Sequence, residues 1–146
     1  MIRAARQQNS DVEGIEFLFV YGSLRESIHH PMRNLLVRQG TCIGTGCLQG
    51  KLYDLGRYPG VVLSTARTDR VLGEVFRIIR SQQVLKLLDE YEGRRFKREQ
   101  VAVVIDDVDK SQISCWAYIY KRSINGRVYI PSGDYLEYRR YLERDL

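Results

Sequence analysis

The sequence predicts an α+β fold: a small mixed, mainly antiparallel β-barrel of about seven short strands with flanking helices. Three observations predict it. Apolar residues recur with a period of two in several short segments and with a period near 3.6 in three others. The strand-like segments lack the regular strand–helix alternation of a doubly wound sheet. The 146 residues are enough for one core that needs no metal or disulfide staple.

The first part of the chain contains one buried strand and one short helix. Residues 1–14 show no hydrophobic periodicity, so we expect a flexible N-terminal tail before a single domain over residues 15–146. The segment Glu16–Tyr21 is almost continuously apolar, which is typical of a strand buried on both faces. Pro31 suits a first helical position and Gly40 a helix stop, which predicts a short helix between them.

The middle of the chain changes from strand to helix periodicity. Extended segments separated by glycine and proline turn signals are expected within Thr41–Ser64. Val71–Ile79 alternates in the manner of a strand. Ser81 is expected to cap the next helix, of about eleven residues, and Gly93 to end it.

The last part predicts a hairpin and a final helix. Phe96–Ile105 and Ile113–Lys121 are expected to pair as antiparallel strands. Asn125 followed by Gly126 predicts a tight turn of type I′. Ser132 or Asp134 can cap the final helix.

The net charge of +5 arises from 23 basic against 18 acidic residues and favours anionic ligands. Nucleic acid is disfavoured as a partner, because the densest basic cluster, residues 94–98, directly follows a run of carboxylates. The longest apolar stretch, Phe17–Tyr21, is far too short to span a membrane. We therefore expect no membrane partner and a cytoplasmic location.

Motifs that would indicate a cofactor or a metal are weak. The spacing of Gly44, Gly46 and Gly50 does not fit a dinucleotide-binding loop, and a strand-like segment follows it. We expect these glycines at β-bulges or close strand crossings. The adjacent His29 and His30 cannot face one metal ion from a helix or strand. The three cysteines, Cys42, Cys47 and Cys115, form no C-x-x-C pair and are interpreted as reduced structural thiols. No cofactor and no metal are expected.

The turn after the first strand can offer backbone donors. The N–H groups of Gly22, Ser23 and Leu24 leave the strand ladder, and such groups can form a nest for a carboxylate or an oxyanion. Ser23 lacks the G-x-S-x-G context of a nucleophile. The alternative is an ordinary strand-to-loop turn.

Three carboxylates crowd the end of the central helix in the segment Leu88–Gly93. The negative helix end raises carboxylate pKa values, which suits a general base or acid. Glu92 can point past the helix end into a cavity, whereas Asp89 is better placed to bond local backbone. The alternative is a network of ion pairs with the nearby arginines, and the residues alone leave both open.

Five short motifs occur in an order that resembles the gamma-glutamylcyclotransferase-like family, in particular its gamma-glutamylamine cyclotransferase and avirulence-induced-gene-like branch. They are V-Y-G-S-L (Val20–Leu24), G-K-L-Y-D-L-G-R-Y-P-G (Gly50–Gly60), L-D-E-Y-E-G (Leu88–Gly93), F-K-R (Phe96–Arg98) and I-P-S-G-D-Y (Ile130–Tyr135). The resemblance covers most of the chain, and the family's fold is a small mixed barrel with flanking helices.

The resemblance implies cyclotransfer. The free α-amino group of a gamma-glutamyl substrate attacks its own γ-carbonyl, releasing 5-oxoproline and an amine or amino acid, with no cofactor. Glu92 matches the catalytic glutamate, as general base and acid. Phe96 stands where the family often has tyrosine. The alternative is a non-catalytic module of the same fold that binds a small carboxylate.

The resemblance also implies a set of substrate-binding residues. Tyr21, Gly22, Ser23 and Leu24 match the family's binding loop, and Arg98 belongs to the F-K-R motif. Tyr118 and Tyr120 alternate with Ile119 and can line the pocket, although at least one of them is expected to pack in the core.

Overall fold

The structure is a computed structural model that describes residues 15–22 and 31–144. The predicted tail over residues 1–14 lies outside the described residues, as do Ser23, Leu24 and the two histidines. The strands are β1 (Glu16–Val20), β2 (Gly40–Asp54), β3 (Pro59–Leu63), β4 (Arg70–Ile78), β5 (Phe96–Ile105), β6 (Gln112–Tyr120) and β7 (Val128–Ile130). The helices are α2 (Pro31–Gln39), α3 (Ser81–Glu92) and α4 (Tyr135–Arg144).

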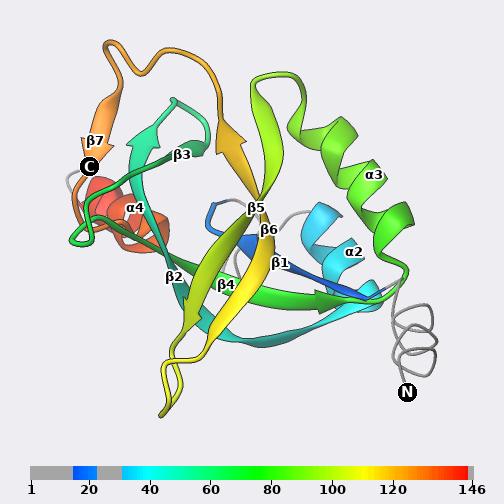
Figure 1. The fold of residues 1–146 in the computed structure, drawn as a ribbon. Coiled ribbons are helices and arrows are strands. Elements are labelled where there is room, and N and C mark those ends of the chain that lie inside the picture. Colours follow the sequence, from blue (N-terminus) through cyan, green and yellow to red (C-terminus); the bar gives the residue numbers. More distant parts are fainter. Residues whose placement is uncertain (1–14, 23–30, 145–146) are drawn as a thin grey trace.

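Five of these strands close into a barrel (Figure 1). The order is β1–β4–β2–β3–β6, and β6 pairs in turn with β1. The β1–β6 and β3–β6 pairings are parallel and the other pairings are antiparallel. β5 extends the sheet beside β6 and also reaches β2, while β7 pairs with β2. This arrangement confirms the predicted mixed, mainly antiparallel barrel.

β2 is long enough to pair with β4 along its first part and with β3 along its last part, and several glycines interrupt it. Its pairing with β4 shifts register between Cys42 and Gly44, and Gly44 has φ of +151°. A Cβ atom at Gly46 would lie 2.9 Å from the carbonyl oxygen of Val104. The expected bulge and close strand crossing are therefore confirmed at these two glycines.

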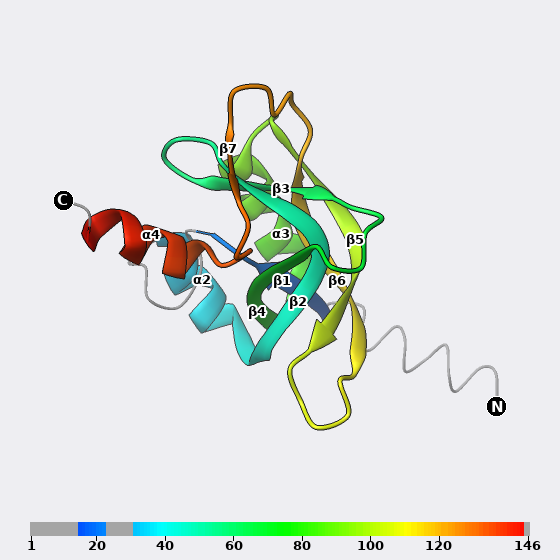
Figure 2. The ribbon, with the colours of Figure 1, turned by 90° about the vertical axis from the view of Figure 1, so that its left-hand side faces the viewer.

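β1 separates two apolar cores. Phe19 points into the barrel, among residues such as Leu52 and Val61, whereas Leu18 points to the outside and packs with Leu88 of α3. The strand is thus buried on both faces, as predicted from its continuous apolarity. Figures 1 and 2 show α2 and α3 covering one side of the barrel and α4 lying on another. No helix in the described part of the chain has the length and apolarity to cross a membrane.

The predicted cap of α3 is wrong, and the predicted tight turn at Asn125 and Gly126 is present but is not of type I′. Ser81 is the first residue of α3, and Arg80 occupies the cap position in a left-handed conformation with φ of 54°. Only Ile79 and Arg80 link β4 to α3, so the chain must turn within two residues. In the turn at Asn125 and Gly126, the N–H of Arg127 donates to the carbonyl of Ile124 at 2.9 Å. Gly126 has φ of +75°, but Asn125 has no positive φ, which excludes a type I′ turn. The turn does not join neighbouring strands, because β7 pairs with β2 and not with β6.

The cap of α4 follows the prediction. Asp134 Oδ1 accepts hydrogen bonds from the backbone N–H groups of Leu136 at 3.1 Å and Glu137 at 3.2 Å. The side chain thereby satisfies two of the donors that every helix leaves unpaired at its N-terminus.

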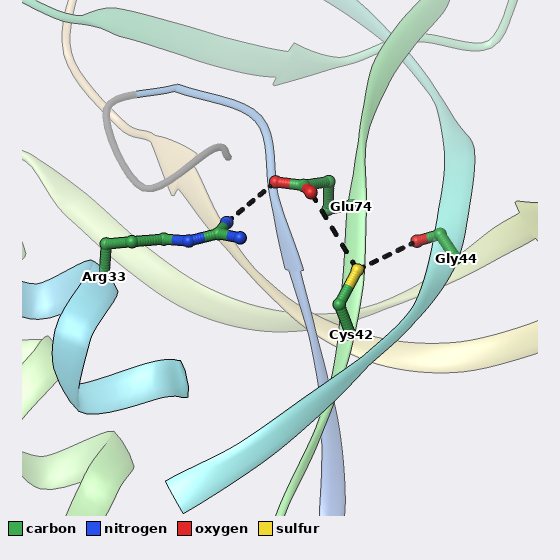
Figure 3. A network of polar contacts seen from close by, with 4 residues as sticks. All are labelled: Arg33, Cys42, Gly44 and Glu74. Carbon is green, nitrogen blue, oxygen red and sulfur yellow. Dashed lines mark hydrogen bonds and ion pairs between the residues drawn. The ribbon is translucent and has the colours of Figure 1, made fainter. Parts of the chain in front are cut away.

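A buried ion pair attaches α2 to the barrel (Figure 3). Glu74 of β4 lies opposite Val20 of β1 and is almost fully buried. Arg33 of α2 donates to its carboxylate at 2.9 Å, and the Cys42 thiol lies 3.9 Å from the other carboxylate oxygen. The guanidinium of Arg33 also lies 4.9 Å from the centre of the Phe76 ring. The contacts hold α2 against the barrel beside the end of β1, where the candidate site begins.

Candidate functional site

A small cavity of about 200 Å³ lies where the end of β1 meets the end of α3. It is smaller than the roughly 300–1,000 Å³ typical of sites for drug-sized ligands, so it suits a ligand about the size of an amino acid. The lining residues come from β1 and the two residues after it, the β2–β3 connection, the start of β3, α3, β5 and β6. They are Phe19, Val20, Tyr21, Gly22, Tyr58, Pro59, Tyr91, Glu92, Phe96 and Tyr118.

Glu92 supplies the carboxylate in the cavity wall. It is the last residue of α3 and is half-buried, and Gly93 ends the helix with φ of +79°. No hydrogen bond to this carboxylate occurs within residues 15–22 and 31–144. Desolvation by burial raises the pKa of Glu92 to about 7. A group that is half-ionised near neutral pH is suited to take up and release protons.

Asp89, three residues earlier on α3, has very different surroundings. Arg98 donates two hydrogen bonds to it, from Nε at 2.8 Å and Nη2 at 3.1 Å, and the Tyr118 hydroxyl donates a third at 2.7 Å. Burial pushes the pKa of Asp89 upward, but the bonds from Arg98 and Tyr118 outweigh it and the pKa is lowered. Asp89 thus bonds side chains of β5 and β6, not the local backbone that the sequence suggested.

The two interpretations of the acidic segment therefore apply to different residues. Asp89 belongs to an ion pair, with Arg98 as its partner. Glu92 forms no ion pair within the described part of the chain and faces the cavity. A separation of three residues places the two carboxylates on one face of the helix, so the difference between them comes from the side chains that surround each one.

Tyr21 connects three strands beneath the cavity. Its hydroxyl donates to the backbone carbonyl of Tyr118 in β6 and accepts a bond of 3.3 Å from the backbone N–H of Val61 in β3. Desolvation raises the pKa of Tyr21, and the charge of Glu92 raises it further. Tyr21 therefore stays protonated and fixes the floor of the cavity.

Gly22 is required by a close contact at the cavity rim. A Cβ atom there would lie 2.7 Å from Cγ of Pro59, which also lines the cavity. The strand end and the β2–β3 connection can approach each other only because the side chain is absent. The donor nest expected from Ser23 and Leu24 remains a prediction, because these residues lie outside the described part of the chain.

Two aromatic rings, Tyr58 and Phe96, form another part of the lining. Tyr58 packs against Phe96 with ring centres 5.9 Å apart, and Phe96 packs against Tyr120, outside the lining, at 5.5 Å. The guanidinium of Arg95 donates to the Tyr58 hydroxyl at 3.3 Å. The two rings thus hold each other in place, and Arg95 brings a positive charge to the Tyr58 hydroxyl.

The cavity brings together four of the residues expected to act or bind: Tyr21, Gly22, Glu92 and Tyr118. Arg98 lies behind the cavity, where it bonds Asp89 and covers the Trp116 ring at 4.2 Å. Tyr120 lies outside the cavity lining and borders a shallow depression beside Lys121. In the described ranges there is no cluster of three or more His, Cys, Asp or Glu residues suited to a metal ion.

Sequence reasoning did not propose Tyr58, Pro59 and Tyr91 as lining residues. Tyr58 and Pro59 lie in the motif Gly50–Gly60, and Tyr91 directly precedes Glu92. A turn signal with an adjacent aromatic residue, next to an expected site, is the feature that could have indicated them.

Most of the chain is similar to known proteins. A family model described as gamma-glutamyl cyclotransferase, AIG2-like, matches residues 18–137. The gamma-glutamylcyclotransferase family protein YtfP from Citrobacter rodentium is 33% identical over 129 residues, which cover 85% of this chain and 98% of that protein.

Solved structures share the fold. YkqA from Bacillus subtilis has a TM-score of 0.70 at 24% identity. The match covers 89% of this chain but 43% of YkqA, so the chain spans less than half of that protein. An AIG2-like protein from mouse has a TM-score of 0.64 at 20% identity, covering 83% of this chain and 88% of the mouse protein.

Proposed function

Because the chain belongs to the AIG2-like gamma-glutamyl cyclotransferase family, we propose that it converts a gamma-glutamyl substrate into 5-oxoproline and a free amine or amino acid. One observation carries the proposal: Glu92, with a pKa of about 7, faces a cavity large enough for a glutamyl group. The proposed reaction needs no metal, because nucleophile and electrophile belong to one molecule and Glu92 handles the protons.

The proposed reaction begins when the Glu92 carboxylate accepts a proton from the α-ammonium group of the substrate. The free amine attacks the γ-carbonyl carbon, and a new C–N bond closes the five-membered ring. The bond from this carbon to the departing nitrogen then breaks. Of the three ammonium protons, one stays on the ring nitrogen and two pass, through Glu92, to the departing amine. Such proton transfer contributes typically ~10²–10⁴-fold to a rate.

Positioning supplies the other large contribution. Well-oriented intramolecular attack can lower a barrier by ~7–11 kcal/mol. In a cavity of about 200 Å³ that the Tyr58 and Phe96 rings border, an extended glutamyl chain has little room. The proposed role of this wall is to favour the folded rotamer that brings the amine to the carbonyl. Backbone N–H groups from Gly22 onward are proposed to hold a substrate oxygen.

The experiment is a turnover assay with a panel of gamma-glutamyl amines and gamma-glutamyl amino acids, in which 5-oxoproline is quantified by chromatography. Glu92→Gln keeps the size of the side chain but cannot accept the proton, so we expect a loss of at least ~100-fold in kcat. The matched control is Glu90→Gln, an exposed residue of the same helix outside the cavity lining, which keeps the wild-type rate.

Two results would contradict the proposal in different ways. Substrate binding without any 5-oxoproline, in wild type and Glu92→Gln alike, would favour the non-catalytic carboxylate-binding module. Wild-type turnover by Glu92→Gln would exclude Glu92 as the general base. Turnover that persists after exhaustive dialysis against a chelator would support the metal-free route.

A further inference from the structure

Two carboxylates on one face of α3 differ in the hydrogen bonds that they accept from the strands beneath the helix. Asp89 accepts three hydrogen bonds, whereas Glu92 accepts none from the described residues. The difference is imposed by β5 and β6, because Arg98 and Tyr118 are direct partners in the ladder between these strands. Their side chains converge on Asp89 from below the helix.

Two carboxylates, Asp89 and Glu92, are possible acceptors for the hydroxyl hydrogen of Tyr118. A tyrosine hydroxyl has a single hydrogen to donate. Tyr118 lines the cavity, is close enough to Glu92 to be affected by its charge, and gives its hydrogen to Asp89 at 2.7 Å. Without that acceptor, the nearby Glu92 carboxylate is the anionic alternative within the described ranges.

Arg98 holds the acceptor in place. Its two parallel hydrogen bonds fix the plane of the Asp89 carboxylate, and its guanidinium lies over the Trp116 ring at 4.2 Å. Such a paired, forked contact gives direction as well as charge. The other titratable and charged groups near Glu92 are Tyr21 directly after β1, Tyr58 of the β2–β3 connection, Tyr91 and Glu90 of α3, and Arg94 and Arg95 after it.

We propose that Asp89 is a positioning residue for proton transfer at Glu92: by accepting the Tyr118 hydroxyl hydrogen, it keeps this donor away from the Glu92 carboxylate. The carboxylate then accepts no hydrogen bond from the described residues and is ready to accept the substrate's proton. This inference rests on the proposed function of Glu92 and adds to it a role for two residues behind the cavity, Asp89 and Arg98.

The expected consequence follows from hydrogen-bond physics. In Asp89→Leu no side-chain acceptor remains for Arg98 or Tyr118, so the Tyr118 hydroxyl is free to turn toward Glu92. A hydrogen bond to an ionised carboxylate favours its charged form and lowers its pKa. The acid limb of kcat/KM therefore moves to lower pH by about one unit, as does the titration of the Glu92 side-chain carbon in NMR.

The experiment is a double-mutant cycle. The Glu92 titration by ¹³C NMR and the pH profile of kcat/KM are measured in wild type, Asp89→Leu, Tyr118→Phe and the double variant. If Asp89 acts through Tyr118, the change of about one unit seen in Asp89→Leu falls to less than half in the Tyr118→Phe background. Glu90→Gln is the control: it shows how far the pKa of Glu92 changes when another α3 carboxylate loses its charge without any change in the hydrogen bond of Tyr118.

The outcomes decide the inference separately from the proposed function. An equal change in both backgrounds, or none in a folded Asp89→Leu, overturns the role of Asp89. The NMR titration does not depend on turnover, so it still decides the role of Asp89 if Glu92→Gln proves active. If Asp89→Leu does not fold, Asp89→Ala, which also lacks an acceptor, enters the same cycle with the same deciding outcomes.

Discussion

Glu92 should lower the stability of the protein at neutral and higher pH, and Glu92→Gln should restore it. Burial raises the pKa of this carboxyl from 4.5 to about 7, so the folded chain holds a proton that the unfolded chain has already released. Between these two values the folded state binds more protons, and the free energy of unfolding therefore falls as pH rises. The penalty is absent below about pH 4.5 and complete above about pH 7. Glutamine does not titrate, so Glu92→Gln does not carry this loss of stability.

The size of the effect follows from the same two values. A rise of about 2.5 pH units at about 1.36 kcal/mol per unit gives at most about 3 kcal/mol. Because Glu92 is only half-buried, solvent screens part of this, and we expect about 1.5–3 kcal/mol at pH 8. For a chain of this length that corresponds to a rise in melting temperature of roughly 4–10 °C.

The assay is urea unfolding of wild type, Glu92→Gln and the control Glu90→Gln at half-unit steps from pH 4.5 to 8.5. The gain in free energy of unfolding for Glu92→Gln should be near zero at the acid end, grow through pH 6 and level off above pH 7.5. A gain that does not vary with pH, or a variant less stable than wild type at pH 8, would refute the reasoning. An equal gain in Glu90→Gln would point to net charge and not to burial.

Further predictions concern activity and three supporting contacts. In wild type, kcat/KM should fall about tenfold per pH unit below pH 7, because the base must be ionised, and stopped-time assays of 5-oxoproline across pH 5–8 test this. Glu74→Gln removes the negative charge facing Arg33 and should lower the free energy of unfolding by about 3 kcal/mol in urea titrations. Tyr21→Phe leaves the buried carbonyl of Tyr118 without its donor and should cost about 1–3 kcal/mol by the same measurement. Asp134→Ala removes the cap of α4 and should cost about 1 kcal/mol, measured by thermal unfolding, with little change in turnover.

The barrel could be predicted from the sequence because its strands and helices carry their own periodicity. β5 begins and ends at the expected residues, and Pro31 and Asp134 mark the starts of α2 and α4. These are local signals, and local propensity and tertiary packing agree there. The cap of α3 was mispredicted because the short link from β4 overrode the preference of Ser81 for a cap position.

The candidate site could be predicted only in part. Glu92 can be identified in the sequence because it lies at a predicted helix end, and the end of β1 because Gly22 follows it. The partners of Asp89, Arg98 and Tyr118, could not be identified in this way, because their positions depend on the register between β5 and β6. The contact between Gly22 and Pro59 also joins segments far apart in the chain, so no local sequence pattern predicts it.

Strand register is what separates the roles of the two carboxylates. In the observed register, Arg98 of β5 lies opposite Tyr118 of β6, and both side chains reach Asp89. Because side chains alternate between the two faces of a strand, a slip of one residue in β5 would turn Arg98 away from α3. Asp89 would then lose its fixed partner, and the Tyr118 hydroxyl would have two competing carboxylates. The helix alone cannot distinguish Asp89 from Glu92, so the sheet beneath it is the part of the fold that leaves one carboxylate as an ion-pair partner and the other as a base.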